Sequence, residues 1–411
     1  MEGWICMESY DRRIVCAPEW MKTFTCTAGA CPETCCQQWN IDVDEVHAER
    51  YQHLDDPGLQ EIMDQTLRSY RLRRPGSRRT ETFYRLQLLN RPDSRCPFLN
   101  GQGECSLQKK YGASILCDTC YFHPRTFWQI DEQTYLSACL SCPECARLAL
   151  LHPEPAAFSC FEAEIDPGAE WLETDLITDP GARRLLRDRS EMIRQLCSAL
   201  QNRDYPLSQR LEHGLDLLKN AEKEYAPGAP ALENSPAAQI CGLQQLMEAF
   251  AGIFDPVPSS IEKPAQGAAV FLHDLAGGTE GYAGLLAENY RRGMEIYQPF
   301  IEAHPYLEEN FLVHCVFSDS FRQFHHYQDD PAGPAEILRH EANLLTAWYW
   351  FFRTVMSLAA LRHGMMDEAL FLQTVIRADK VWWHYPDWFS RCADRLGVVM
   401  GSGGSGLMFL M

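Results

Sequence analysis

Cysteine is the residue type whose number and spacing in this chain most directly indicate chemistry. Thirteen of the 18 cysteines fall within the first 145 of 411 residues, and several lie only two to five positions apart. Thiolates at that spacing converge on soft metal ions or on iron–sulfur clusters. The sequence therefore predicts a metal or iron–sulfur site in the N-terminal region.

The first cysteine group reads Cys26-x4-Cys31-x3-Cys35-Cys36. Adjacent cysteines do not readily form a disulfide with each other, but they can ligate one cluster together or divide their roles. The pattern lacks the two CxxC pairs of a zinc ribbon. It also differs from the CxxxCxxC of radical S-adenosylmethionine enzymes, because position 38 is glutamine.

Two further groups follow. Cys96 and Cys105 are separated by Asn-Gly and Gln-Gly steps, which favour a tight turn that brings the two thiols together. Cys117-Asp-Thr-Cys120 could be a redox dithiol, but no thioredoxin-like strand and helix surround it, so metal ligation is favoured. The third group, Cys139-x2-Cys142-x2-Cys145, has ferredoxin-like spacing. The number of thiols is sufficient for one four-ligand cluster or for two metal sites, and the spacing of the cysteines does not distinguish between these alternatives.

Together these groups resemble the bacterial flagellin lysine-N-methylases. The later Glu309-Asn310-Phe311-Leu312 looks like the C-terminal helical signature of that family. The matching N-terminal residues are Phe24-Thr-Cys26, Cys31-Pro-Glu-Thr-Cys35-Cys36 with Trp39, Cys96-Pro-Phe-Leu99, Cys105, Leu116-Cys117-Asp-Thr-Cys120 with Pro124-Arg125, and Ser141-Cys142-Pro-Glu144.

The resemblance implies methyl transfer from S-adenosylmethionine to the ε-amino group of flagellin lysines, in the cytoplasm, by a protein that holds a [4Fe-4S] cluster. Cys139 and Cys145 flank the family's Cys142 and look like additions. The metal ligands that the resemblance implies are Cys26, Cys31, Cys35, Cys36, Cys96, Cys105, Cys117, Cys120 and Cys142.

The segment from Cys96 to Cys120, with the Cys35-Cys36 pair, is also similar to small cysteine-cluster proteins known as zinc or iron chelators. The rival hypothesis is therefore a non-enzymatic protein in which zinc or iron only holds the fold together. A small chelating module would not need some 250 further residues, whereas an enzyme that holds a cofactor and a protein substrate would.

A lysine must lose its proton before it attacks a methyl sulfonium, so a lysine methylase needs a base or a pocket that lowers the pKa of the amine. Glu144 and His123 are the candidate bases nearest to the cysteine groups, and each could instead be a structural hydrogen-bonding residue. His123 stands where the family more often has tyrosine. Arg125 could pair with the carboxylate of the cofactor or form a buried ion pair.

Composition limits the class of protein. The net charge of −19 excludes a general nucleic-acid binder. With 46% hydrophobic residues the chain can bury a large core without disulfides. The N-terminus does not read as a signal peptide, and no stretch reaches the apolar length of a membrane span. We therefore expect a cytoplasmic protein with reduced thiols, and the sequence leaves its oligomeric state open. The cysteines expected to be ordinary thiols are Cys6, Cys16, Cys160, Cys197, Cys241, Cys315 and Cys392.

The elements that must position these residues are mainly α-helical. We predict a cysteine-cluster domain over residues 1–160, of mixed but largely helical structure, a helical domain over 161–400, and a flexible tail over 401–411. The aromatic run from Trp348 to Phe352 is expected in the core, and His314 and His340 at the surface. A glycine-rich stretch at 269–281 resembles a Rossmann cofactor loop, but a turn between helices is favoured. Helical periodicity is clearest over residues 182–200, 207–218, 240–250, 282–303, 307–324, 335–362 and 366–378.

Overall fold

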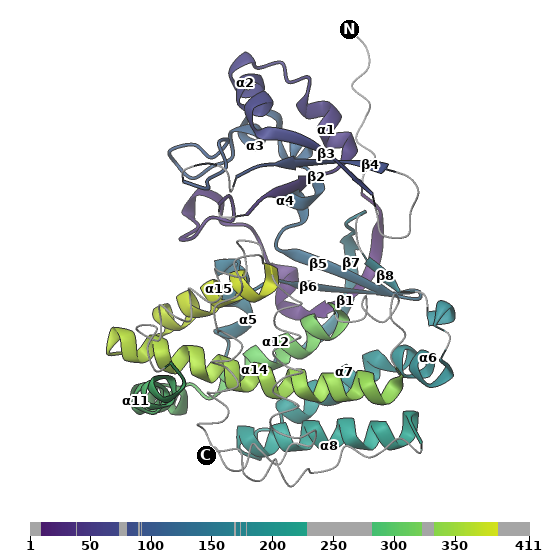
Figure 1. Cartoon of the computed structure of the whole chain (residues 1–411), viewed down its shortest axis with the longest axis vertical. Coiled ribbons are helices and arrows are strands. Elements are labelled where there is room, and N and C mark those ends of the chain that lie inside the picture. Colours follow the sequence, from purple (N-terminus) through teal and green to yellow (C-terminus); the bar gives the residue numbers. More distant parts are fainter. Residues whose placement is uncertain are drawn as a thin grey trace.

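The computed structural model describes residues 10–384 except for 38, 74–79, 89–90, 92, 168–169, 173, 178, 228–281 and 323–332. The described part of the chain is arranged in three tiers along its longest axis (Figure 1). A small sheet with short helices forms one end, a larger sheet lies in the middle, and long helices form the other end. The predicted helix at 240–250, the glycine-rich stretch at 269–281 and the tail lie outside the described residues.

The middle tier is a mixed five-stranded sheet in the order β7-β1-β6-β5-β8. β5 and β6 form an antiparallel hairpin that turns at Asp131, and β1 pairs in parallel with β6. Period-two alternation in β1 buries Val15 and Ala17 and exposes Ile14. The strands are β1 (Arg12–Pro18), β5 (Arg125–Ile130), β6 (Gln133–Ala138), β7 (Phe158–Glu164) and β8 (Glu170–Leu172).

The small tier holds a three-stranded antiparallel sheet in the order β2-β4-β3. Its strands are β2 (Ile41–Val43), β3 (Leu67–Arg73) and β4 (Thr80–Leu86). The short helices of the N-terminal region are η1 (Glu19–Thr23), η2 (Ala28–Ala30), α1 (Glu45–Tyr51), α2 (Pro57–Thr66), α3 (Ser106–Tyr111), η3 (Ala113–Ile115), α4 (Asp118–Phe122) and α5 (Pro143–Leu150).

Both sheets thus lie mostly in the region predicted to be largely helical. The predicted mixed structure is present, but the region is not largely helical, because strands form its framework and its helices are short. β7 crosses the predicted boundary at residue 160 and pairs with β1 along its whole length. The position of the boundary itself stays a prediction.

The helical tier confirms the periodicity read from the sequence. The stretch predicted as one helix over 182–200 is two helices that meet at Asp188. The other predicted helices in the described residues begin and end within a few residues of the predicted bounds, except that the helices predicted at 207–218 and 366–378 extend further at their C-terminal ends. The helices of this tier are η4 (Thr174–Leu176), α6 (Pro180–Arg187), α7 (Arg189–Leu200), α8 (Leu207–Tyr225), α11 (Tyr282–Ala303), α12 (Tyr306–Arg322), α14 (Pro334–His363) and α15 (Glu368–His384).

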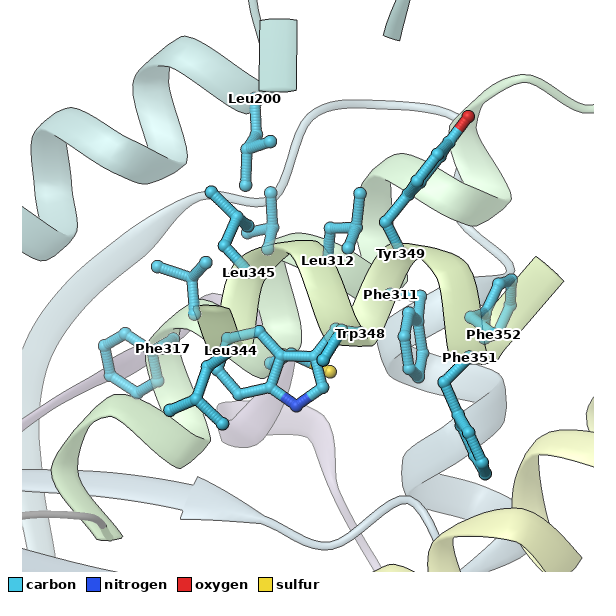
Figure 2. Close-up of a cluster of buried hydrophobic side chains, with 14 of the residues drawn as sticks. Leu200, Phe311, Leu312, Phe317, Leu344, Leu345, Trp348, Tyr349, Phe351 and Phe352 are labelled. Carbon is cyan, nitrogen blue, oxygen red and sulfur yellow. The ribbon is translucent and has the colours of Figure 1, made fainter. Parts of the chain in front are cut away.

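α14 is the central helix of this tier. Proline occupies its first position, and it ends at Gly364, whose φ of 69° is the left-handed conformation that glycine adopts without strain. The aromatic run from Trp348 to Phe352 is buried, as predicted. The rings of Phe311 in α12 and Phe352 stack with centroids 4.0 Å apart (Figure 2). The Phe311–Phe352 stack thus joins α12 to α14, and the consecutive buried aromatic residues show that neighbouring elements enclose α14.

By length and composition α14 could also cross a membrane, contrary to the expectation that no stretch is apolar enough. In the structure 83% of its most apolar window is buried inside the protein. Neighbouring elements, α8, α11 and α12 among them, cover this surface.

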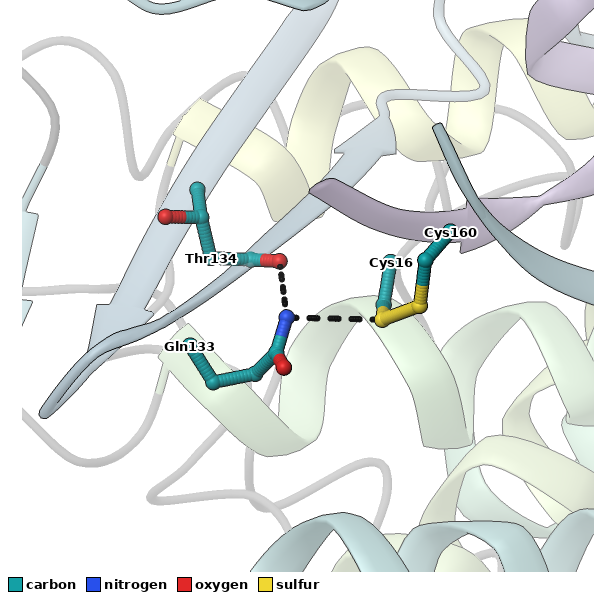
Figure 3. The surroundings of a disulfide bond; sticks show 4 residues. All are labelled: Cys16, Gln133, Thr134 and Cys160. Carbon is teal, nitrogen blue, oxygen red and sulfur yellow. Dashed lines mark hydrogen bonds between the residues drawn. A yellow bond between two sulfur atoms is a disulfide. The ribbon is translucent and has the colours of Figure 1, made fainter. Parts of the chain in front are cut away.

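Two expectations about single residues are wrong. His314 is buried in α12, with 8% of its surface exposed, and does not lie at the surface. Cys16 and Cys160 are not ordinary thiols, because they form a disulfide that joins β1 to β7 (Figure 3). The two residues lie directly opposite each other in the antiparallel pair, which places their sulfurs within bonding reach. The amide of Gln133 lies 3.4 Å from the Cys16 sulfur.

Candidate metal centre

Five of the predicted ligands gather inside the small tier, and we call them the core thiol group. They pack in one hydrophobic cluster with β2, β4 and the short helices. The Cys36 carbonyl accepts a hydrogen bond of 2.8 Å from the backbone N–H of Cys96. Cys117 precedes the first residue of α4, and Cys120 lies one turn later in that helix. The members of the core thiol group are Cys36, Cys96, Cys105, Cys117 and Cys120.

The predicted turn between Cys96 and Cys105 is present. Cys105 pairs with Leu99 in an isolated β-bridge, and Gly103 turns the chain with a φ of 75°. A second glycine, Gly29 in η2, packs against this turn so closely that a Cβ there would lie 2.8 Å from the Gln102 carbonyl oxygen. The loop between Cys26 and Cys31 is therefore docked onto the turn of the core thiol group.

The other four predicted ligands form a second set, the surface thiol group: Cys26, Cys31, Cys35 and Cys142. Burial raises the pKa of Cys31, and the neighbouring thiolates of Cys142 and Cys26 raise it further. The same two thiolates raise the pKa of Cys35, after the larger effect of its hydrogen bond to Cys36. Cys26 and Cys35 are exposed, whereas Cys31 and Cys142 are half-buried. The thiol of Cys142 thus lies near enough to affect the ionisation of Cys31 and Cys35, although it is far from both in sequence.

Contacts from the helical tier support the surface thiol group. The carboxylate of Asp379 in α15 accepts a hydrogen bond of 2.6 Å from the backbone N–H of Ser141, the residue before Cys142. Lys380 in the same helix pairs with Glu33, between Cys31 and Cys35, at 3.1 Å. α15 therefore holds both segments that carry this group.

The donor chemistry fits a soft metal centre. A hydrogen bond from Cys35 lowers the pKa of Cys36 to about 7, and one from Cys145 lowers the pKa of Cys142 to about 7. Burial instead raises the pKa of Cys96 to about 12. Buried thiols of this kind ionise readily only when a cation supplies positive charge, as zinc or iron does. Each group holds at least the four thiols that such a centre needs.

The two candidate bases flank these groups differently. Glu144, in the first turn of α5, receives two hydrogen bonds from Arg147 at 2.9 and 2.7 Å, and this pairing lowers its pKa. His123 caps the C-terminal end of α4, close to Cys120. Its ring lies 5.4 Å from the ring of Trp39, whose indole N–H donates to the Cys35 carbonyl. His123 therefore lies at the end of the helix that carries Cys120 and against Trp39, which contacts Cys35.

The main contacts of Arg125 among the described residues are with backbone carbonyls and aromatic rings rather than with a buried carboxylate. Its guanidinium donates to the carbonyl oxygens of Tyr121 and Phe122, at 2.6 and 3.2 Å, and packs over both rings. Burial lowers the pKa of Arg125. A role in holding a cofactor carboxylate stays a prediction.

A compact trio beside the core thiol group was missed by sequence reasoning. One ligand atom from each of Asp44, His47 and Asp118 lies within 4.8 Å of the others. The Asp44 carboxylate caps α1, where it contacts the His47 ring at 2.8 Å, and it also accepts from the Asp118 backbone N–H. The capping pattern of Asp44 three residues before His47 was the available signal. These hydrogen bonds already use the Asp44 oxygens to fix α1 against α4.

Comparison with known proteins gives a family. Residues 194–397, about half of the chain, match the model described as the FliB lysine N-methylase C-terminal domain. The chain is also 28% identical over 145 residues to lysine-N-methylases of Salmonella choleraesuis and Salmonella typhimurium, and this match covers 35% of the chain and 34% of each relative. The flagellar biosynthetic protein FliU of Salmonella muenchen is 28% identical over 143 residues, which cover 35% of this chain and 80% of FliU.

No solved structure matches the chain. The matched segment spans about a third of the length of the two lysine-N-methylases. The match to the C-terminal domain and the cysteine motifs of the N-terminal region nevertheless indicate the same family. The chain therefore belongs to the FliB lysine N-methylase family.

Proposed function

We propose that this protein is a protein-lysine N-methyltransferase that uses S-adenosylmethionine to methylate flagellin lysines and carries a cysteine-ligated [4Fe-4S] cluster. The observation that carries the proposal is the C-terminal domain match to the FliB lysine N-methylases. The gathering of nine thiols into two groups supports the cluster. The name of FliU supports a flagellar substrate.

In the proposed reaction the lysine Nζ attacks the methyl carbon of the sulfonium. The N–C bond forms as the S–C bond breaks, the sulfur keeps the electron pair and S-adenosylhomocysteine leaves. The proton that the ammonium must lose goes to a base of the protein. A cluster, if bound, would be held by thiolates of the two thiol groups, and deprotonation of the lysine would fall to a separate base of the protein.

Of the two candidate bases, His123 is the better placed. Glu144 is held on both oxygens by Arg147, and this pairing lowers the pKa of the carboxyl. A carboxylate stabilised in this way takes up a proton from lysine less readily. His123 lies beside Trp39 and close to Cys120, and imidazole is the common base near neutral pH. We therefore assign the base to His123 and a positioning role to Glu144.

A cytoplasmic location belongs to the same proposal, because flagellin must be modified before export. The net charge of −19 suits a neutral or basic segment of the substrate. The Cys16–Cys160 disulfide is unusual for a reducing compartment. Thiol labelling of protein taken directly from cells tests the cytoplasmic location, since Cys16 and Cys160 should both be reduced in a cytoplasmic protein.

The decisive test is a methylation assay with the full chain purified without oxygen. Flagellin and S-adenosylmethionine with a deuterated methyl group are added, and lysine peptides are analysed by mass spectrometry. We expect label on lysine Nζ that depends on the enzyme. Flagellin whose lysines have been chemically blocked is the matched control. Absence of label from protein with a full complement of iron and sulfide would refute the function.

One observation favours a second function, the non-enzymatic zinc or iron protein. The core thiol group lies inside a hydrophobic cluster with Cys117 fully buried, as in a metal site that only stabilises a fold. Metal analysis separates the two. Iron with equal sulfide supports the cluster enzyme, whereas colourless protein with zinc alone and no methylation supports the structural chelator.

A further inference from the structure

Two side chains of α1 form hydrogen bonds with the segment that carries Cys117 and Cys120. The Tyr51 hydroxyl, at the last residue of α1, accepts a hydrogen bond of 2.9 Å from the backbone N–H of Cys117. The Asp44 carboxylate, at the N-cap of α1, accepts one of 3.1 Å from the backbone N–H of Asp118. Both N–H groups lie at the start of α4, where a helix has no carbonyl of its own to accept from them. The two ends of α1 therefore supply acceptors to the first residues of α4.

Tyr51 is enclosed beside the core thiol group. It is 1% exposed and packs in the same hydrophobic cluster as Cys117 and Cys120. Its hydroxyl also donates a hydrogen bond to the Cys117 sulfur. A hydroxyl can accept from an N–H and donate to another atom at the same time. Tyr51 thus contacts both the backbone and the side chain of one predicted ligand.

Asp44 holds α1 and α4 together. One of its oxygens accepts from the backbone N–H of His47 at 2.9 Å, and the other lies 2.8 Å from the ring Nδ1 of the same residue. This second oxygen is the one that accepts from Asp118. The trio of Asp44, His47 and Asp118 therefore acts as a brace between the two helices.

α4 needs such support because it has only five residues, too few for a helix to be stable by its own hydrogen bonds. The relative positions of Cys117 and Cys120 must therefore be fixed by contacts from outside the segment. In metal sites, residues that hydrogen-bond a ligand set its orientation and affect the metal affinity. Hydrogen bonds to the sulfurs of an iron–sulfur cluster also affect its reduction potential.

We infer that Tyr51 and Asp44 are positioning residues for a metal centre that includes Cys117 and Cys120. α1 holds the segment between these two ligands in the orientation that the metal requires, before the metal binds. The Tyr51 hydroxyl in addition tunes the centre through its hydrogen bond to the Cys117 sulfur. The inference rests on the metal binding within the proposed function but not on methyl transfer.

The experiment compares two variants of the full chain purified without oxygen. Tyr51→Phe removes the hydroxyl and keeps the ring in the hydrophobic cluster. It should release its iron or zinc to excess EDTA about 10-fold faster than the wild type. Tyr111→Phe is the matched control, because the Tyr111 hydroxyl also accepts from a backbone N–H, that of Asp56 at 3.2 Å, and packs against the same cluster. It should release metal at the wild-type rate.

A second readout separates positioning from a general loss of stability. If the metal is iron, the midpoint potential of the cluster should be lower in Tyr51→Phe, because a hydrogen bond to the Cys117 sulfur is lost. If the metal is zinc, the sulfur-to-metal charge-transfer bands of the cobalt(II)-substituted protein should shift. Tyr111→Phe should change neither property.

Asp44→Asn tests the other end of α1. Asparagine still caps a helix, but its amide cannot replace both of the accepting oxygens of Asp44. Metal release should again be faster than in the wild type, by about threefold or more. Asp56→Asn is the matched control, because Asp56 caps α2 in the same way, through the N–H groups of Gly58 and Leu59.

Equal metal release from Tyr51→Phe and Tyr111→Phe, with the same potential or spectrum, would overturn the inference, as would wild-type protein that holds no metal. Amide hydrogen exchange in the wild type keeps the inference testable if the variants misfold. The N–H groups of Cys117 and Asp118 should exchange slowly even after the metal is removed, and fast exchange would show that α1 does not fix them. Because metal release and exchange are measured rather than methylation, protein that passes these tests without activity would fail only the proposed function.

Discussion

His314 shows how a single residue can set the acid stability of the protein. Burial in α12 lowers its pKa to about 4, and its ring contacts the Ser318 hydroxyl. The unfolded chain takes up a proton on this residue near pH 6.5, but the folded protein does so only near pH 4. Stability is therefore lost as the pH falls through this window, by up to about 3 kcal/mol.

The variant His314→Gln should lack this part of the pH dependence, because glutamine does not titrate. Urea unfolding at several pH values between 7 and 4 measures it. The exposed His213 is the control, and His213→Gln should leave the pH dependence unchanged. An unchanged slope in H314Q would show that burial does not lower the pKa of His314.

The second prediction for single residues concerns the two candidate bases, His123 and Glu144. His123→Gln should lower kcat for flagellin methylation by about 100-fold at neutral pH, because it removes the proposed base. Glu144→Gln should change kcat by less than about threefold, since the exposed pair with Arg147 contributes little. Initial rates over a range of pH measure both. A loss in E144Q that exceeds the loss in H123Q would reverse the assignment.

At the scale of elements, α12 joins the helical tier through a buried carboxylate. Glu309 is 1% exposed and accepts from Arg203 at 2.8 Å and from Arg210 at 2.6 Å. Removing its charge leaves the buried Arg210 guanidinium without its partner. Glu309→Gln should therefore lower the free energy of unfolding by about 3 kcal/mol or more.

Chemical denaturation measures this loss, with Glu302→Gln on the exposed side of α11 as control. The control should change the free energy of unfolding by less than about 0.5 kcal/mol. Equal effects of the two substitutions would show that the buried ion pair does not stabilise the helical tier.

The disulfide between β1 and β7 gives a second prediction for elements. It closes a loop of 144 residues, so the double variant C16S/C160S should lower the free energy of unfolding by about 3 kcal/mol in oxidising buffer. In reducing buffer the wild type and the variant should be equally stable. A difference that persists with reductant would assign the effect to packing at these positions.

At the scale of the whole molecule, the helical tier depends on the N-terminal region. Asn310 of α12 donates to the carbonyl oxygens of Leu150 and His152, which end and follow α5. Ser318 hydrogen-bonds Ser137 of β6. One hydrophobic cluster includes Trp128 and residues of α12 and α14. The family signature around Asn310 thus fastens the two parts together.

A fragment of residues 161–411 should therefore expose apolar surface and aggregate, whereas the full chain unfolds cooperatively. Gel filtration and thermal unfolding of the two proteins check this. A monomeric fragment with its own cooperative transition would instead support a domain boundary at residue 160.

The helices of the C-terminal half could be predicted because each has its own apolar periodicity, and α11 begins and ends where that pattern does. The strands of the N-terminal region could not. β2 and β8 are only three residues long, and their partners β4 and β5 lie far away in sequence. A short strand has too few residues to show a period, and its stability comes from the sheet around it.

The sequence by itself determined the family and the turn that folds Cys105 toward Cys96, and it predicted a soft-metal site from nine cysteines, because side-chain chemistry and turn conformation are local properties. Only the tertiary structure decided that α15 holds the segment before Cys142, that Cys36 and Cys120 pack in one hydrophobic cluster, and that Cys16 pairs with Cys160. These pairings depend on sheet register and on the docking of α15, and such long-range contacts leave no spacing in the sequence to read.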